Sequence, residues 1–232
     1  MNKFLPTLCA AAGIFVATLT SAQAAADPAF GNMGASFSAN IGITNNYVWR
    51  GITQTNDDFA VQGGADVEFD SGFSLGVWAS NVDFGDGTEA EIDLYGSYSI
   101  PLTEMVSANV GAIGYFFAGQ PSGADYTFFE SNVGLDFDLG MATLSTSVAY
   151  SPDVGNETTW YFNSGLGIPL GEIFEVFGGV GYYQWESSPN IIDYNIGVSA
   201  TWGNFTVSTY YAGTDIASDN GSFVVMLTAA VP

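Results

Sequence analysis

The sequence alternates apolar and polar residues along most of its length. In TTWYFNSGLGI, residues 158–168, the even positions from Trp160 onward are mostly large and apolar, and the odd positions are mostly small or polar. In YTFFESNVGLDFDL, residues 126–139, the odd positions from Phe129 are mostly apolar, whereas Glu130, Asp136 and Asp138 occupy even positions. A period of two residues is typical of strands with one apolar and one polar face. No segment shows a sustained helical period.

Turn residues divide this pattern into twelve segments. They are mostly longer than the usual strand of about five or six residues, and close to the ten-residue alternating unit of outer-membrane barrels. We expect strands near residues 35–50, 59–70, 73–82, 89–100, 104–117, 125–138, 140–151, 157–168, 173–186, 190–202, 204–212 and 222–231.

The connectors between these segments alternate in length. Tight turns such as 101–103 follow every second segment, and longer acidic stretches such as 51–58, 83–89 and 151–157 follow the others. Both ends of the chain then lie on the side of the short turns, as in bacterial outer-membrane proteins. We therefore predict an all-β fold, a transmembrane antiparallel up-and-down β-barrel of about twelve strands.

The acidic residues avoid the apolar face of the predicted strands. The expected register assigns eight of the 24 acidic residues to the polar face: Asp66, Glu68, Glu91, Asp93, Glu130, Asp136, Glu175 and Asp193. The others fall in connectors, at strand ends or at the start of the chain. A charge facing lipid at mid-bilayer costs a few kcal/mol, so this distribution fits a membrane. A soluble β-sandwich or a lipocalin-like barrel would also keep charges off its core face.

Aromatic residues on the apolar face gather towards the strand ends. At the long-loop end they are Tyr47, Trp49, Phe59, Phe116, Tyr150, Trp160, Tyr194, Tyr211 and Phe223. At the short-turn end they are Phe37, Phe69, Phe73, Tyr98, Phe137, Phe174, Trp202 and Phe205. Two aromatic girdles around an aliphatic belt match the two interfaces of a bilayer. This placement favours the membrane barrel over the soluble alternatives.

The N-terminus resembles a secretory signal. Lys3 precedes an apolar stretch and a small-x-small cleavage site at residues 22–24. We expect residues 1–24 to be the signal peptide and residues 25–232 to be one barrel domain. Cleavage would remove Lys3 and Cys9, leaving no cysteine and one cation, Arg50, against 24 anions. Such a chain would repel nucleic acid.

Arg50 takes an inward position in the segment 35–50 if Tyr47 and Trp49 face lipid. It would then lie near the rim of an acid-lined lumen. A guanidinium offers five donors in a rigid fork and can bridge several carboxylates. Arg50 either neutralises carboxylates and holds a loop, or belongs to a constriction that tunes passage. The expected lumen-lining and selectivity residues are Arg50, Asp66, Glu68, Glu91, Asp93, Glu130 and Asp136.

Two sequence elements resemble a known family. YVWRGITQT at residues 47–55 and WASNVDF at residues 78–84 closely resemble conserved elements of the proteobacterial Gcw_chp family, whose members are also called TorF family porins. The resemblance is specific through about residue 100 and architectural after that. It implies a signal-bearing outer-membrane barrel, but the family itself is of unknown function.

The chain lacks the residues of several kinds of chemistry. It has no histidine, so a Ser-His-Asp triad is excluded, and we expect no enzymatic activity, no cofactor and no metal site. We expect a passive, cation-preferring channel for small polar or cationic solutes. It would be a monomer in the outer membrane of a Gram-negative bacterium, in contact with lipids and lipopolysaccharide. The alternatives are a non-conducting barrel with a structural or surface-interaction role, and an exported soluble β-protein.

Overall fold

The computed structural model describes residues 34–231, so the expected signal peptide lies outside the described residues. The strands are β1 (Ala35–Thr44), β2 (Val48–Trp49), β3 (Ile52–Thr53), β4 (Ala60–Phe69), β5 (Phe73–Asn81), β6 (Ala90–Pro101), β7 (Val106–Ala118), β8 (Phe128–Asp138), β9 (Thr143–Val154), β10 (Glu157–Leu170), β11 (Phe174–Trp185), β12 (Ile191–Trp202), β13 (Phe205–Thr214) and β14 (Ser222–Val231).

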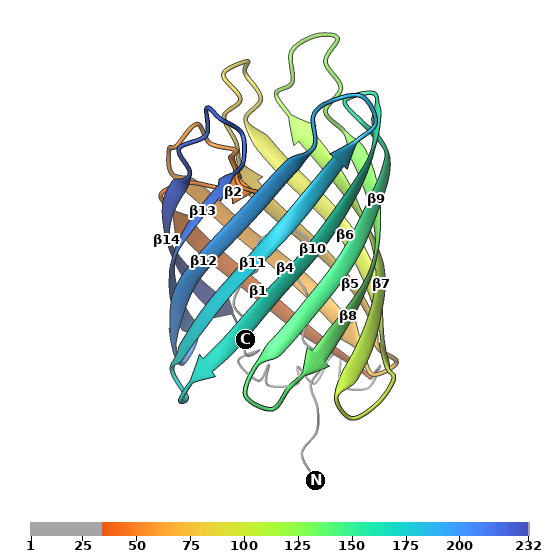
Figure 1. Ribbon diagram of the computed structural model, residues 1–232, viewed down its shortest axis with the longest axis vertical. Coiled ribbons are helices and arrows are strands. Elements are labelled where there is room, and N and C mark those ends of the chain that lie inside the picture. The colour runs from red at the N-terminus through yellow and green to blue at the C-terminus, as the bar shows by residue number, and fades with distance from the viewer. Residues whose placement is uncertain (1–33, 232) are drawn as a thin grey trace.

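Twelve of the strands in this part of the chain close into one antiparallel barrel. Each pairs with its neighbour in chain order, except that β2 and β3 are skipped, so that β1 pairs with β4 and also with β14 to close the ring. Long loops gather at one end and short turns at the other (Figure 1). This confirms the predicted fold class and strand number. Residues 34–231 contain no helix long and apolar enough to cross a membrane.

The two faces of the barrel wall follow the period-two pattern. On β6, Ile92 and Leu94 are exposed on the outside, whereas Glu91 and Asp93 between them are buried on the inside. The same alternation recurs around the ring and leaves an outer surface of aliphatic and aromatic side chains. A soluble barrel would bury its apolar face instead. The apolar outer surface therefore contradicts the soluble alternatives.

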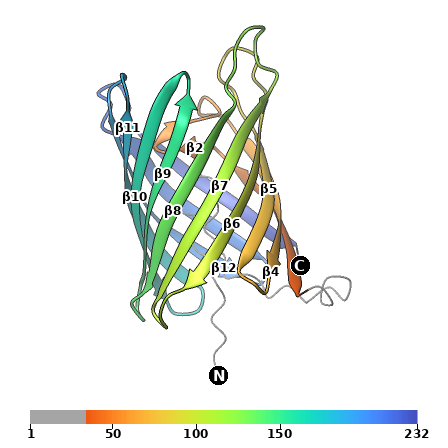
Figure 2. The same ribbon diagram turned by 90° about the vertical axis from the view of Figure 1, so that its right-hand side faces the viewer.

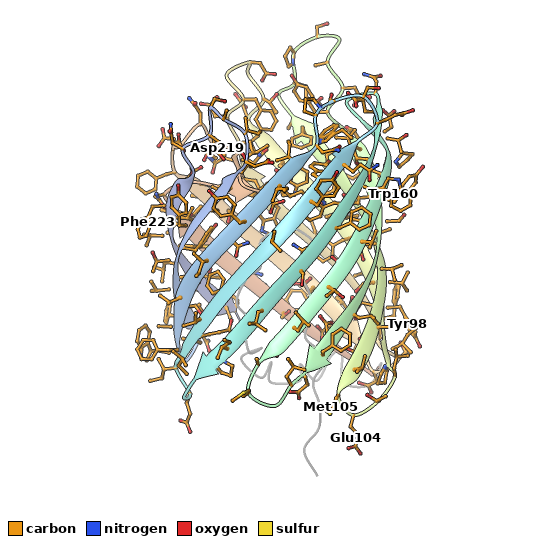
Figure 3. The ribbon with its side chains drawn as sticks, in the orientation of Figure 1. Tyr98, Glu104, Met105, Trp160, Asp219 and Phe223 are labelled. Atoms are coloured by element: carbon orange, nitrogen blue, oxygen red, sulfur yellow. The ribbon has the colours of Figure 1, made fainter. Side chains whose placement is uncertain are left out.

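Aromatic side chains stand outward near both ends of the barrel. Trp160 and Phe223 project from the wall towards the long-loop end, and Tyr98 projects nearer the short-turn end (Figure 3). Two aromatic residues predicted to face lipid at the long-loop end lie inside the barrel instead. Tyr47 is 1% exposed and Trp49 is partly buried, and both pack against residues inside the barrel.

The first predicted strand, residues 35–50, is also wrong, because the strand in the barrel wall ends earlier. β1 ends at Thr44, and the chain then leaves the wall and forms the small β2–β3 sheet. Both views show β2 within the ring of strands near the long-loop end (Figures 1 and 2).

One connector is shorter than expected. The acidic segment 151–157 is mostly strand, because β9 continues to Val154 and β10 begins at Glu157. Gly155 and Asn156, both with positive φ, form the two-residue turn between them. This geometry matches the right-handed twist of the paired strands.

Candidate functional site: an inward hairpin and two tiers of carboxylates

A hairpin crosses the lumen near the long-loop end. Val48 pairs with Thr53 and Trp49 with Ile52, leaving Arg50 and Gly51 as the two turn residues. Their φ angles are 47° and 79°, which suits the mirror-image turns that connect short hairpins. A Cβ at position 51 would lie 2.6 Å from the backbone oxygen of Gly213. The Arg-Gly turn therefore allows the hairpin tip to approach β13 closely.

Two asparagines fix the base of this hairpin. Asn45 donates from Nδ2 to the carbonyl of Phe223 at 3.0 Å, and its Oδ1 accepts from the amide of Val225 at 2.7 Å. Asn46 accepts from Thr53 Oγ1 at 2.6 Å, which ties the two arms of the loop together. The loop is thus anchored on β14, beside the strand from which it leaves.

The tip of the hairpin reaches the opposite wall. Arg50 Nη2 donates to both carboxylate oxygens of Glu130, on β8, at 2.8 Å each. The guanidinium carbon lies 3.8 Å from the ring centroid of Tyr161 and 4.6 Å from that of Tyr183, on β10 and β11, and 4.3 Å from that of Trp49. The side chains of Arg50 and Glu130 are only 3% and 5% exposed. We call this group of one cation, one carboxylate and three rings the arginine cage.

Apolar packing fills the space beside the arginine cage. Val48 joins a buried cluster with Phe177, Tyr210, Ala212 and Val224, from β11, β13 and β14. Trp49 contacts the rings of Tyr115 and Phe128, from β7 and β8, on another part of the wall. The hairpin therefore touches strands all around the barrel and narrows the lumen at this level.

Four inward carboxylates form an upper tier at the level of the hairpin. All are at most 5% exposed: Glu91, Asp93, Glu130 and Asp193. Glu130 belongs to the arginine cage. Asp193 accepts from Tyr161 Oη at 3.1 Å, and Glu91 accepts from Tyr47 Oη at 3.4 Å. Asp93 has no hydrogen-bond donor in the described part of the chain.

The other four inward carboxylates form a lower tier towards the short turns, where the side chains are only partly buried: Asp66, Glu68, Asp136 and Glu175. Asp66 accepts from Tyr95 Oη at 2.6 Å. Asp136 accepts from Asn109 and Ser145 at 2.5 Å each. No arginine or lysine side chain of residues 34–231 pairs with this tier, because Arg50 is bonded to Glu130.

Glycines leave room for the inward tyrosine–carboxylate pairs. Tyr95 crosses over Gly76 on β5 to reach Asp66 on β4, and a Cβ at Gly76 would overlap both side chains. A Cβ at Gly181 would likewise overlap Tyr161 and Asp193. Because glycine has no side chain at these positions, the tyrosine–carboxylate pairs can lie flat against the barrel wall.

Hydrogen bonds also order the long loops. Tyr126 Oη donates to Asp86 at 2.6 Å and lowers the pKa of that carboxyl group, with the amide of Thr88 adding to the effect. Asp219, in the loop before β14, accepts from the amide and hydroxyl of Thr214 and the amide of Gly221. Burial raises the pKa of Asp219, but these hydrogen bonds outweigh it, and the net pKa is lowered.

The arginine cage combines expected and unexpected residues. Arg50 lies inside the barrel, as the sequence suggested, but its position on a hairpin and its distant partner Glu130 were not foreseen. The inward positions of Tyr47 and Trp49 were missed. Two signals were available: the consecutive asparagines at 45–46, which are typical of turns, and the length of the expected strand 35–50, which exceeds that of the others.

The fold and the hairpin together define a class: a twelve-stranded antiparallel barrel of the outer-membrane type, with its lumen narrowed by its first long loop. The family model for bacterial proteins of unknown function named Gcw_chp matches residues 28–228, and the chain belongs to this family. The resemblance noted from residues 47–55 and 78–84 is thereby confirmed.

Solved porins share the fold at low sequence identity. The chain resembles the KdgM porin with a TM-score of 0.64 and 9% identity, over 84% of this chain and 98% of that one. A structure of the KdgM porin in complex with disordered oligogalacturonate gives 0.61 and 8%, over 85% and 98%. The NanC porin gives 0.57 and 10%, over 84% and 99%. No protein of curated function matches the chain.

Proposed function

We propose that this protein is a porin-like channel in the outer membrane of a Gram-negative bacterium, and that it passes small polar solutes with a preference for cations. The main support is the charge of the inner wall. Eight carboxylates face inward, and Arg50, paired with Glu130, is the one basic side chain among the described residues. Rings of carboxylates favour cations and repel anions in narrow pores.

The carboxylates of the lower tier would produce the preference for cations. Asp66, Glu68 and Asp136 are partly exposed inside the barrel. A solute entering from the short-turn side would meet these carboxylates before it reached the hairpin. The hairpin would then limit solute size, and transport would need no catalysis. Lipids and lipopolysaccharide would surround the apolar outer wall of a monomer.

The ligand of the KdgM porin does not suit this lumen. Oligogalacturonate is a chain of sugar acids and therefore an anion. The inward carboxylates here would repel such a solute because like charges in a narrow, low-dielectric space interact strongly. We infer a different class of solute for this chain, cationic or neutral and small.

A second candidate is a barrel that does not conduct. The support is the burial at the level of the hairpin, where Arg50, Glu91 and Tyr115 are each at most 4% exposed. In this case the hairpin would be a plug, and the long acidic loops would act in surface contacts or envelope structure.

Recordings in planar bilayers under a salt gradient separate these functions. The same recordings would be made on a variant in which an Asn-Gly turn replaces residues 48–53. The short loop can close in this variant because the backbone amide of Gln54 already donates to the carbonyl of Tyr47 at 2.6 Å. A cation-favouring reversal potential in the wild type, with larger conductance after removal of the hairpin, would support the channel. Silence in the wild type and conductance only in the variant would support the plug. Anion selectivity would refute the proposal.

A further inference from the structure

A pair of carboxylates on β6 has no counter-charge among residues 34–231. Glu91 and Asp93 stand two residues apart and point to the same inner face. Asp93 is 0% exposed and Glu91 is 3% exposed. No donor among residues 34–231 lies within hydrogen-bond distance of either oxygen of Asp93. The one hydrogen bond to the Glu91 side chain in this part of the chain comes from Tyr47, at 3.4 Å.

The rest of the site is built from oxygen-bearing and aromatic side chains. Asp93 is directly paired with Tyr115 on β7 and with Trp78 on β5. Tyr115 is 1% exposed, and its hydroxyl also lacks a partner in the described chain. Tyr47, from the hairpin segment, lies over this group with its ring 5.3 Å from that of Trp78. Asp93 thus lies between Trp78 and Tyr115 on the inner face, with Glu91 two residues away and bonded to Tyr47.

Electrostatics requires either a proton or a cation at this pair of carboxylates. An ionised carboxylate removed from water is strongly destabilised unless it is paired, and two neighbouring ones also repel each other. Two of the other inward acids avoid this cost through donors: Glu130 has Arg50, and Asp136 has Asn109 and Ser145. Glu91 and Asp93 can both be ionised only when a cation joins them.

We propose that Glu91 and Asp93 bind a hydrated hard divalent cation of the Mg²⁺ type. Such ions prefer oxygen ligands, keep several of their waters and bind to proteins through one or two carboxylates. A charge of two neutralises the pair, and the hydroxyl of Tyr115 and the bound waters satisfy the remaining polar atoms. Residues 34–231 contain no group of three or more acidic, histidine or cysteine side chains placed to hold a metal ion together, so the ion would rest on these two carboxylates.

The cation would also order the hairpin. Tyr47 precedes β2 and donates to Glu91, so a fully charged, ion-bound Glu91 strengthens the hydrogen bond that holds this segment to β6. This site is independent of whether the barrel conducts, because equilibrium binding does not depend on solute passage.

Terbium luminescence tests the site. Tb³⁺ is a luminescent probe for hard-cation sites, and Trp78, opposite Asp93, can sensitise it. The experiment excites tryptophan in the purified, detergent-folded barrel, titrates Tb³⁺ and then competes with Mg²⁺. We expect one sensitised site that Mg²⁺ displaces. Asp93→Asn should weaken this site about 100-fold or more, because loss of even a supporting residue costs about 10–100-fold in metal affinity.

The control removes the same charge elsewhere. Asp138 is exposed at the short-turn end of β8, and its side chain accepts from the amide of Gly140, which asparagine can still do. Asp138→Asn should bind Tb³⁺ like the wild type, and Glu91→Gln gives a second test if Asp93→Asn does not fold. The proposal is overturned by the absence of Mg²⁺-displaceable emission in the wild type, or by equal emission in Asp93→Asn. Either result would mean that the pair shares a proton instead.

Discussion

Replacing Glu130 by glutamine measures how much the ion pair at the tip of the inward hairpin contributes to the docking of the hairpin. The substitution keeps the size of the side chain and one acceptor oxygen, but leaves Arg50 without a negative partner at 3% exposure. Breaking a buried ion pair by removing one partner costs about 3–5 kcal/mol. The rings of Trp49, Tyr161 and Tyr183 remain over the guanidinium. Because these cation–π contacts are retained at about 0.5–2 kcal/mol each, we expect the lower end of that range.

A loss of about 3 kcal/mol has a measurable consequence. It lowers the ratio of docked to undocked hairpin roughly 150-fold, since each 1.4 kcal/mol is about a factor of ten. Hydrogen exchange of a peptide covering residues 45–59 reports this ratio, because the amide of Gln54 is protected by the carbonyl of Tyr47 only in the folded hairpin. Asp136→Asn is the matched control: it neutralises an inward carboxylate that lies in the lower tier and bonds to Asn109 and Ser145.

A double substitution completes the test. Arg50→Met together with Glu130→Gln should cost less than the sum of the two single changes, because neither buried charge is left unpaired. Unchanged exchange in Glu130→Gln would refute the reasoning. It would show that the packing of Val48 and Trp49 holds the hairpin, and that the ion pair contributes no net free energy to docking.

Three further substitutions test other parts of the structure. Gly51→Ala places a Cβ 2.6 Å from a backbone oxygen of β13 and should speed hairpin exchange, whereas Gly140→Ala, at the same φ of 79° but with no atom within 4 Å, should not. The lowered pKa of Asp219 means that its carboxylate stabilises the loop 215–221 above the unfolded pKa of about 3.9. This contribution is lost as the pH falls through the lower folded value, so Asp219→Asn should remove an acid-induced rise in loop exchange. Val133→Lys, on the outer wall at 61% exposure, should cost about 2–4 kcal/mol of folding stability in lipid vesicles. Asn132→Lys on the inner face should cost less, and equal losses would contradict the assignment of faces.

The sequence predicts the barrel wall well because the controlling interactions are local. A strand that separates lipid from an inner space needs apolar side chains at every second position, and this rule acts on each segment separately. Ile92 and Leu94 outside, with Glu91 and Asp93 inside, could therefore be assigned before any contact was known. Pairing between consecutive strands then follows from the short connectors, which bring neighbouring segments together.

The site depends on contacts that local pattern does not encode. Tyr47 and Trp49 are apolar enough for a lipid-facing girdle, but they lie inside the barrel instead. Tyr47 packs there against Trp78, and Trp49 packs against Phe128 and Tyr183. Alternation has the same period in a wall strand and in an inward hairpin, so the pattern cannot distinguish them. Only the turn at 45–46 and the anchoring of Asn45 on β14 direct the chain inward.

The partner of Arg50 was likewise decided by the tertiary structure. The sequence determined that one cation would face many inward carboxylates. Glu130 is 80 residues away from it, and nothing in its local sequence distinguishes it from the other acids. Closure of twelve strands in one register brings β8 opposite the hairpin tip at the height of Arg50. The same closure encloses Asp93 between Trp78 on β5 and Tyr115 on β7, and neither side chain donates a hydrogen bond to it.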